Sequence, residues 1–310
     1  MSRPRTITLA LAALLCPWPA FGAFAEEGGE PLTGAALPRQ VRMIGGEPLA
    51  VVDGEELRAE DVFPVLFLTH TDLIYAALEQ AVRRRLMLKE VERLSITVRP
   101  ELLDESVAAV LKNQEDEFQL AAGPDYVFES FIQERYGTAP EDYRGAVRNQ
   151  VLEELFLARV IRYEAGLEEQ VEVRMIILAD LALAKEVAGK LAEGASFSAL
   201  AKAHSIDPTN SQGGRFPPVR RDCPHPLLDG LDELSAGQVG EVSTLERSGQ
   251  QLYRILRLDR VIPADRRPYG ERAEEIEKGL AERKIDPFEV LEWDRRVRER
   301  YPIEVRLGRA

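Results

Sequence analysis

The order of elements between residues 171 and 259 constrains the fold of this chain more than any other feature. Apolar runs of strand length stand at its two ends, with helical periodicity and turn residues between them. The elements are a strand, two helices, a Gly-Gly turn, a short helix ending at 234–240 and a closing strand: residues 171–178, 182–193, 197–208, 213–214, 234–240 and 251–259. This order predicts a small domain in which helices cover a sheet.

The N-terminal residues have the pattern of a secretory signal. Arg3 and Arg5 precede an apolar run at 7–15, and the Ala-Phe-Ala of 23–25 supplies small residues at a cleavage point. The run has about half the length that a membrane span requires, and a short uncleaved anchor is the alternative. We therefore expect a signal peptide at 1–25, export across the inner membrane, and a soluble periplasmic or other extracytoplasmic protein without stable membrane insertion.

Charge and cysteine content restrict the partners. The formal net charge is −13, and loss of Arg3 and Arg5 with the signal makes the chain more acidic still. Such a chain gains no counterion release on nucleic acid and is repelled by anionic lipid. Cys223 is the single cysteine beyond the signal, so the mature chain can form no internal disulfide. We expect protein partners and no nucleic acid; the sequence does not indicate an oligomeric state.

Helical patterns fill most of residues 47–165. Before them, residues 26–46 are rich in Gly, Pro, Ala and Glu without periodicity, which predicts a flexible lead-in. Asp53-Gly54 between two extended runs predicts a hairpin. Apolar periodicity, an N1 proline, a terminal glycine and a capping-box spacing then predict helices at 73–94, 100–120, 126–136 and 138–163.

Residues 263–310 return to helical patterns after the strand-rich segment. A proline-containing link leads to a predicted helix at 272–282, and Asp286-Pro287 restarts a second one that runs through Val297. Residues 301–305 read as an extended piece.

Several phrases resemble known families. FSALAKAHSIDP and LSAGQVG resemble the parvulin peptidyl-prolyl isomerases (rotamases). In front of them VVDGEEL, ALEQAVRRRLMLKEVER, ITVRPELLDESV and FIQERYG followed by YRGAVRNQVLEEL are similar to the SurA and PrsA type of extracytoplasmic folding factor. The resemblance implies an α+β fold. A mostly helical SurA-like chaperone body at 47–165 is completed by the C-terminal segment 263–310, and a parvulin-like domain (an FKBP-like β-sheet plus helices) is inserted at 168–262.

The resemblance also implies an active site whose polar residues have changed. The first-strand histidine of the family falls on Met175 and the last-strand histidine on Gln251. The family's Cys or Asp falls on Asp207, and its threonine on Glu246. Asp207, Met175 and Gln251 are thus the expected but degenerate catalytic positions, and Glu246 is an expected substrate-binding position. Met175 is equally typical of a strand core, and Asp207 of a turn.

Isomerisation requires an apolar socket more than reactive groups. Rotation about a peptide bond has a barrier of ~18–20 kcal/mol. An enzyme lowers it by holding the proline ring and favouring the twisted carbonyl. By resemblance the socket residues are Phe216, Cys223 and Leu227. No metal and no cofactor is expected, since the chain's three histidines share no metal-ligand spacing.

We therefore expect a folding factor that binds unfolded or extended proline-containing polypeptides, with weak or absent isomerase catalysis. Two alternatives remain open: an active parvulin isomerase despite the lost histidines, and a non-enzymatic envelope scaffold with a fixed protein partner. Aromatic side chains could supply a client-binding surface or simply a helical core: Phe63, Phe67, Tyr126, Phe128, Phe131, Tyr136 and Trp293.

Overall fold

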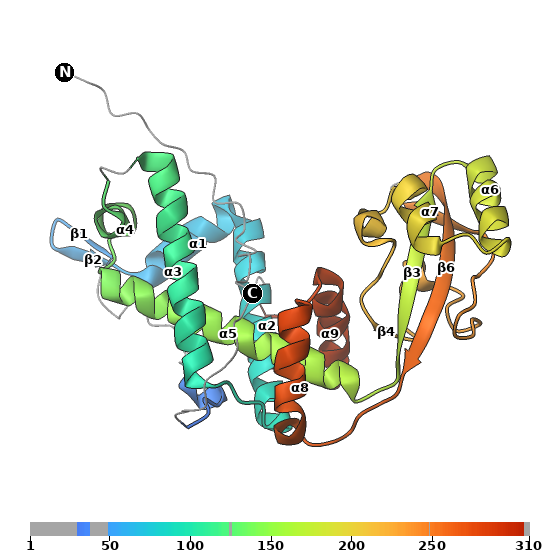
Figure 1. The fold of residues 1–310 in the computed structure, drawn as a ribbon. Helices are drawn as coiled ribbons and strands as arrows, with labels where there is room; N and C mark the ends of the chain where they lie inside the picture. Colours follow the sequence, from blue (N-terminus) through green and yellow to red (C-terminus); the bar gives the residue numbers. More distant parts are fainter. Residues whose placement is uncertain (1–29, 38–48, 124–125, 248, 307–310) are drawn as a thin grey trace. The chain divides into compact units, whose positions relative to one another are not determined.

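The computed structural model describes residues 30–37, 49–123, 126–247 and 249–306. The predicted signal peptide lies outside these residues. The chain separates into two compact units. The first comprises the described residues up to Ala59 together with Thr97–Phe156, and the second comprises Glu60–Ile96 with the described residues from Leu157 onward. Helices alternate with small antiparallel sheets, so the predicted α+β class is confirmed (Figure 1).

The first unit is a helical layer with one hairpin. Its elements are β1 (Ala50–Val52), β2 (Glu55–Leu57), α3 (Pro100–Ala122), α4 (Phe128–Tyr136) and the first part of α5 (Pro140–Gly166). Phe118 packs against Phe128 and Phe131, with ring centroids 5.5 and 4.8 Å away. The lead-in expected to be flexible is paired where it is described, because Leu32 exchanges backbone hydrogen bonds with Val98.

The second unit contains helices from both ends of the chain. They are α1 (Ala59–Thr69), α2 (Thr71–Leu94), the end of α5, α8 (Tyr269–Glu282) and α9 (Pro287–Arg300). Trp293 and Val297 of α9 are fully buried. Arg298 pairs with Glu79 of α2 at 2.6 Å. The C-terminal helix is therefore packed on a helix from the N-terminal half.

Buried charge ties three of these helices together. The carboxylates of Glu90 on α2 and Glu164 on α5 are buried, and Arg93 and Arg300 pair with both of them. The guanidinium groups hold the pKa of Glu90 below its ordinary value, even though burial acts to raise it. Removing either arginine would leave a buried charge without compensation.

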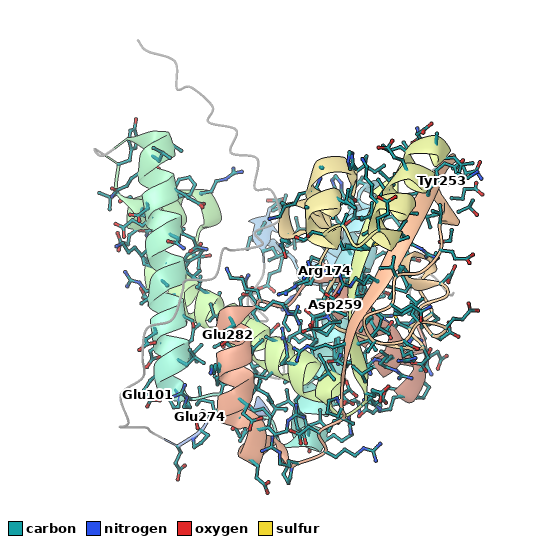
Figure 2. All side chains as sticks on the ribbon, turned by 45° about the vertical axis from the view of Figure 1, so that its right-hand side comes forward. Glu101, Arg174, Tyr253, Asp259, Glu274 and Glu282 are labelled. Carbon is teal, nitrogen blue, oxygen red and sulfur yellow. The ribbon has the colours of Figure 1, made fainter. Side chains whose placement is uncertain are left out.

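The sheet of the second unit has the order β4-β3-β6-β5 and is antiparallel throughout. Its strands are β3 (Gln170–Leu178), β4 (Val219–Arg220), β5 (Ser243–Arg247) and β6 (Gln250–Ile262), and α6 (Leu181–Ala192) and α7 (Phe197–His204) follow β3. Arg174 and Asp259 form a cross-strand pair at 2.7 Å (Figure 2).

The short helix expected before residue 240 is not formed. The segment contains only the 3-10 turn η3 (Pro226–Leu228). Pro224, Pro226 and Gly230 explain the difference, because proline lacks the N–H that a helix needs and glycine favours turns.

No single helix in the described ranges has both the length and the apolar character of a membrane span. The pair α1 and α2, bent by 114°, meets those two requirements jointly.

Candidate functional site

The two faces of the four-stranded sheet are covered differently. Alternation along β3 sends Ile176 and Leu178 to one face, where α6 and α7 pack; we call this the helix-covered face. Met175 and Ile177 point to the other face, which irregular chain from 216 to 234 covers; we call this the niche face.

Met175 and the three expected socket residues lie together on the niche face. Phe216 is 6% exposed and Cys223 7% exposed, and Leu227 packs against the same apolar cluster. Met175 is fully buried in it. The structure therefore joins residues that are separated by up to 52 positions in sequence.

A glycine turn positions Phe216. The N–H of Met175 donates to the carbonyl of Gly214 at 2.8 Å, and the N–H of Phe216 donates to the carbonyl of Val173 at 2.9 Å. Gly214 has φ +76°, and a Cβ there would lie 2.4 Å from the Met175 oxygen. Only glycine allows this close approach, which seats Phe216 beside Met175.

Gln251 and Glu246 are not part of this cluster. They pair with each other across β6 and β5 and are both exposed. Gln251 is one residue away from Leu252, whose side chain is in the niche-face cluster, so it projects from the opposite face. The structure thus does not bring Gln251 or Glu246 to Met175.

Asp207 is buried and acts as a turn cap. Its Oδ1 accepts hydrogen bonds from the backbone N–H and the hydroxyl of Thr209, at 2.9 and 2.6 Å. It precedes the 3-10 turn η2 (Pro208–Gln212). The turn role foreseen as the plain alternative for Asp207 accounts for these contacts.

Arg254 is a niche-face residue that the sequence comparison with parvulins missed. It pairs with Ile177 in the register, and its side chain is buried. Its guanidinium donates to the carbonyls of Pro226 and Asp229, the latter at 2.7 Å, and to the hydroxyl of Ser243. Burial lowers its pKa. The cation therefore fastens the covering loop to the sheet.

A signal for Arg254 was present in the sequence. Apolar residues alternate along the closing strand at positions 252, 256 and 258, which places Arg254 in line with them. Alternation also separates Gln251 from that row. The alternation of residues along the strand therefore assigns Arg254 and Gln251 to their faces of the sheet more accurately than the resemblance to the family did.

A phenylalanine from α9 covers the niche. The ring of Phe288 meets Phe216 edge-on at 4.7 Å and His225 at 5.0 Å between centroids. Nδ1 of His225 accepts from the N–H of Leu227 at 3.2 Å. Burial lowers the pKa of His225.

The thiol of Cys223 is not a nucleophile in this setting. Burial, with a smaller contribution from Glu292, raises its pKa to about 12. A thiol with such a pKa is protonated at neutral pH, and reactivity requires the thiolate. The niche therefore offers apolar contact and exclusion of water, while its cation, Arg254, is engaged with backbone oxygens.

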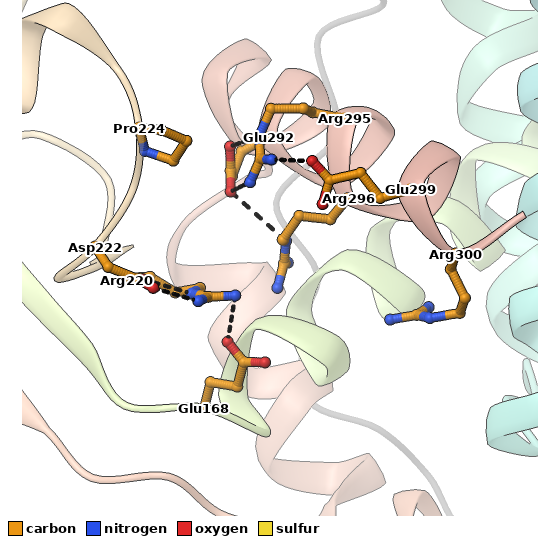
Figure 3. Close-up of a pocket in the computed structure, with 9 residues that line it drawn as sticks. All are labelled: Glu168, Arg220, Asp222, Pro224, Glu292, Arg295, Arg296, Glu299 and Arg300. Atoms are coloured by element: carbon orange, nitrogen blue, oxygen red, sulfur yellow. Dashed lines mark hydrogen bonds and ion pairs between the residues drawn. The ribbon is translucent and has the colours of Figure 1, made fainter.

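A polar cavity of about 510 Å³ lies between α9 and the chain around β4 (Figure 3). Pro224 and Glu292 are among the residues that line it. Arg220 pairs with Asp222 and Glu168 on one side of it. Arg295 pairs with Glu292 and Glu299 on the other. The charges that line the cavity are largely paired with each other.

The fold consists of an antiparallel sheet domain, with helices on one face, joined to a helical body. No family model and no curated protein matches the chain. Its structural neighbours are PrsA- and SurA-like peptidyl-prolyl isomerases and chaperones. PrsA from Bacillus subtilis is 21% identical over 85% of this chain and 96% of that one, with a TM-score of 0.30.

Two further solved structures are similar to a comparable degree. Foldase protein PrsA from Streptococcus pneumoniae is 19% identical over 84% of this chain and 96% of that one, with a TM-score of 0.34. A PpiC-type peptidyl-prolyl cis-trans isomerase domain is 24% identical over 33% of this chain and 99% of that one, with a TM-score of 0.28. At such scores the likeness assigns no role to any residue of this chain.

Proposed function

We propose that this chain is an extracytoplasmic folding factor that binds unfolded or extended polypeptides, with little or no isomerase activity. The observation that carries the proposal is the uncovered apolar surface of α1 and the start of α2. No residue of α1 is buried in the structure. The surface comprises the exposed side chains of Phe63, Val65, Leu66, Leu68, Leu73 and Tyr75.

An apolar surface of this kind suits weak and broad binding of polypeptides. Scattered single apolar residues are normal on proteins, but many exposed on one short segment indicate an interaction site. Glu60, Asp61 and Asp72 flank the group in sequence, and the net charge of −13 favours solubility. Of the aromatic residues expected to form either a binding surface or a core, Phe63 is exposed, whereas Trp293 is buried in the core.

The other aromatic residues contribute less to such a surface. Phe128 and Phe131 pack on Phe118 in the core of the first unit. Tyr126 is exposed, but it belongs to that other unit. Phe67 is half-buried, and the side chain of Tyr136 lies outside the described part of the chain.

The niche is the proposed second contact, for apolar or proline side chains of the same polypeptides. Weak catalysis is expected because neither the thiol of Cys223 nor the guanidinium of Arg254 is available to favour a twisted carbonyl. Met175 is apolar, Cys223 is protonated, and Arg254 is engaged with Pro226, Asp229 and Ser243. Ring binding and desolvation remain, and these alone supply part of the barrier reduction.

Suppression of aggregation of an unfolded client tests the binding role. Leu68 is 82% exposed on α1, so Leu68→Glu should weaken suppression several-fold without loss of stability. Leu120→Glu is the matched control, because Leu120 is 90% exposed on α3 and does not belong to the surface proposed. Equal suppression by both variants and the unmodified chain would contradict a client-binding role for α1.

An isomerase assay on an X-Pro peptide tests the catalytic part. We expect the uncatalysed relaxation, which takes tens to hundreds of seconds. A clear acceleration would instead support the active parvulin alternative. Capture of one tight partner in place of many weak ones would support the scaffold alternative. Cell fractionation tests the extracytoplasmic location, which rests on the signal pattern of residues 1–25.

A further inference from the structure

The niche is occupied by the chain's own C-terminal helix. Phe288 lies in the first turn of α9, and its ring meets Phe216 and His225 edge-on. Glu292, one turn further along the same side of α9, acts electrostatically on both Cys223 and His225. Two positions of one helix thus cover an expected binding surface.

The first turn of α9 is held rigidly in this position. The side chain of Asp286 accepts from the N–H of Phe288 at 2.8 Å. Glu289 accepts from the N–H of Asp286 at 2.9 Å, which completes a capping box. The placement of Phe288 therefore follows from a defined helix start and not from a loose terminus.

The rest of α9 is anchored elsewhere in the same unit. Trp293 and Val297 are fully buried, and Arg300 pairs with the buried Glu164 of α5. These contacts involve a different side of the helix from Phe288 and Glu292. If the contact at the niche opens, α9 can stay in place while the sheet moves away.

The contact at the niche is not packed on every side. The polar cavity of about 510 Å³ borders it, and its lining includes Glu292 and Arg296 (Figure 3). The Nε atom of Arg296 is buried without a hydrogen bond in the described residues, and its ion pair with Glu292 is long, at 3.7 Å. Relative motion between parts of a chain is the usual expectation unless their interface is large and hydrophobic.

The connections to the sheet domain offer a place for such movement. The chain enters the sheet after Gly166 and leaves it before Asp265, and the N–H of Asp265 donates to the carbonyl of Gly166 at 2.8 Å. Arg272 also donates to the carbonyl of Asp265. The two connections therefore leave from one point, as in a hinge at the ends of secondary-structure elements.

We propose that α9 is an autoinhibitory latch: Phe288 and Glu292 close the niche formed by Phe216, Cys223 and Leu227, and a polypeptide enters only when this contact opens. The inference rests on the proposed function and adds its regulation. The niche then alternates between a closed state and an open, binding-competent state, and the closed state lowers the apparent affinity for a client.

Labelling of Cys223 in the full chain tests the latch without any client. The closed contact protects this thiol by burial and by its high pKa, so opening should expose a reactive group. Phe288→Ala should raise the labelling rate of Cys223 at least about tenfold. Leu291→Ala, at a 66% exposed position of the same helix, should leave it unchanged. Peptide mass analysis separates Cys223 from Cys16.

The dependence of the Cys223 labelling rate on urea distinguishes opening of the latch from general unfolding. In the unmodified chain, opening of a latch exposes little surface, so the labelling rate should stay flat at urea concentrations below the unfolding transition. Labelling that rises with urea in parallel with global unfolding would overturn the proposal. So would equal rates in Phe288→Ala and the unmodified chain.

Binding of a fluorescent, extended, proline-containing peptide completes the test. Phe288→Ala should bind it at least about tenfold more tightly than the unmodified chain, since the closed state no longer competes. Unchanged or weaker binding by Phe288→Ala, in a chain that does bind the peptide, would overturn the latch. Faster labelling with no peptide binding by either protein would support the latch and contradict the niche as a polypeptide site.

Discussion

The two faces of the central sheet have the same depth of burial but different chemistry. On the helix-covered face, Ile176, Ile255 and Phe197 are almost completely buried among other apolar side chains. On the niche face, Met175 is equally buried, yet Arg254 lies in the same layer. The first face is covered by two helices, whereas the second is closed by irregular chain and by Phe288. The difference separates a face that provides stability from one that can open.

The covering of the niche face explains why a cation is buried there. Residues 216–234 contain several prolines, so their carbonyls cannot all be satisfied by helix or sheet hydrogen bonds. Arg254 supplies donors to two of those carbonyls, of Pro226 and Asp229. The same guanidinium is then unavailable to a substrate.

The largest effect is expected on the helix-covered face. Phe197→Ala should lower the free energy of unfolding by about 4 kcal/mol, because a buried aromatic ring is replaced by a cavity. Denaturant titration measures this loss. The labelling rate of Cys223 below the unfolding transition should stay unchanged; a large increase there would mean that the two faces are not independent.

Arg254→Met should have a somewhat smaller effect, on the niche face. It removes donors from the carbonyls of Pro226 and Asp229, and we expect a loss of about 3 kcal/mol in the free energy of unfolding. Arg260→Met is the control on the same strand, since Arg260 pairs with Glu172 in an exposed position. The control should lose much less, because an exposed ion pair contributes little to stability. Equal losses would show that Arg254 has no special role.

The smallest effect is a pH dependence from His225. Burial lowers the pKa of His225 in the folded chain, so the unfolded chain binds more protons. Its contribution to stability is therefore complete above the ordinary pKa of about 6.5 and is lost as the pH falls below that value. Asp229 and Glu292 act in the opposite direction and limit the effect.

Denaturant midpoints at pH 7.5 and 5.5 measure this contribution. The unmodified chain should lose more stability on acidification than His225→Asn, whose amide oxygen can still accept from the N–H of Leu227. An identical pH dependence of stability in both proteins would show that His225 does not cause it.

Much of the fold could be predicted from local signals. The Asp53-Gly54 hairpin has the positive φ values that its turn requires, and Pro100 begins α3 as expected. The helix α1 was not predicted, because its residues 62–68 are apolar without interruption and include Pro64. Such a segment lacks the periodicity from which helices are recognised.

The site was less predictable because it depends on contacts distant in sequence. Phe216, Cys223 and Leu227 were grouped from a family resemblance, and they do share one cluster. Nothing local to Phe288 indicates that its ring reaches a residue 72 positions away. That contact is a property of the tertiary fold.

A photoreactive benzoylphenylalanine in place of Phe288 tests the central claim most directly. Without a client, illumination should crosslink position 288 to the segment 216–227 of the same chain, and the same group at position 291 should not. An unfolded polypeptide at saturating concentration should reduce this internal crosslink in proportion to its occupancy. An internal crosslink that persists undiminished with bound client would contradict a niche that α9 closes and polypeptides open.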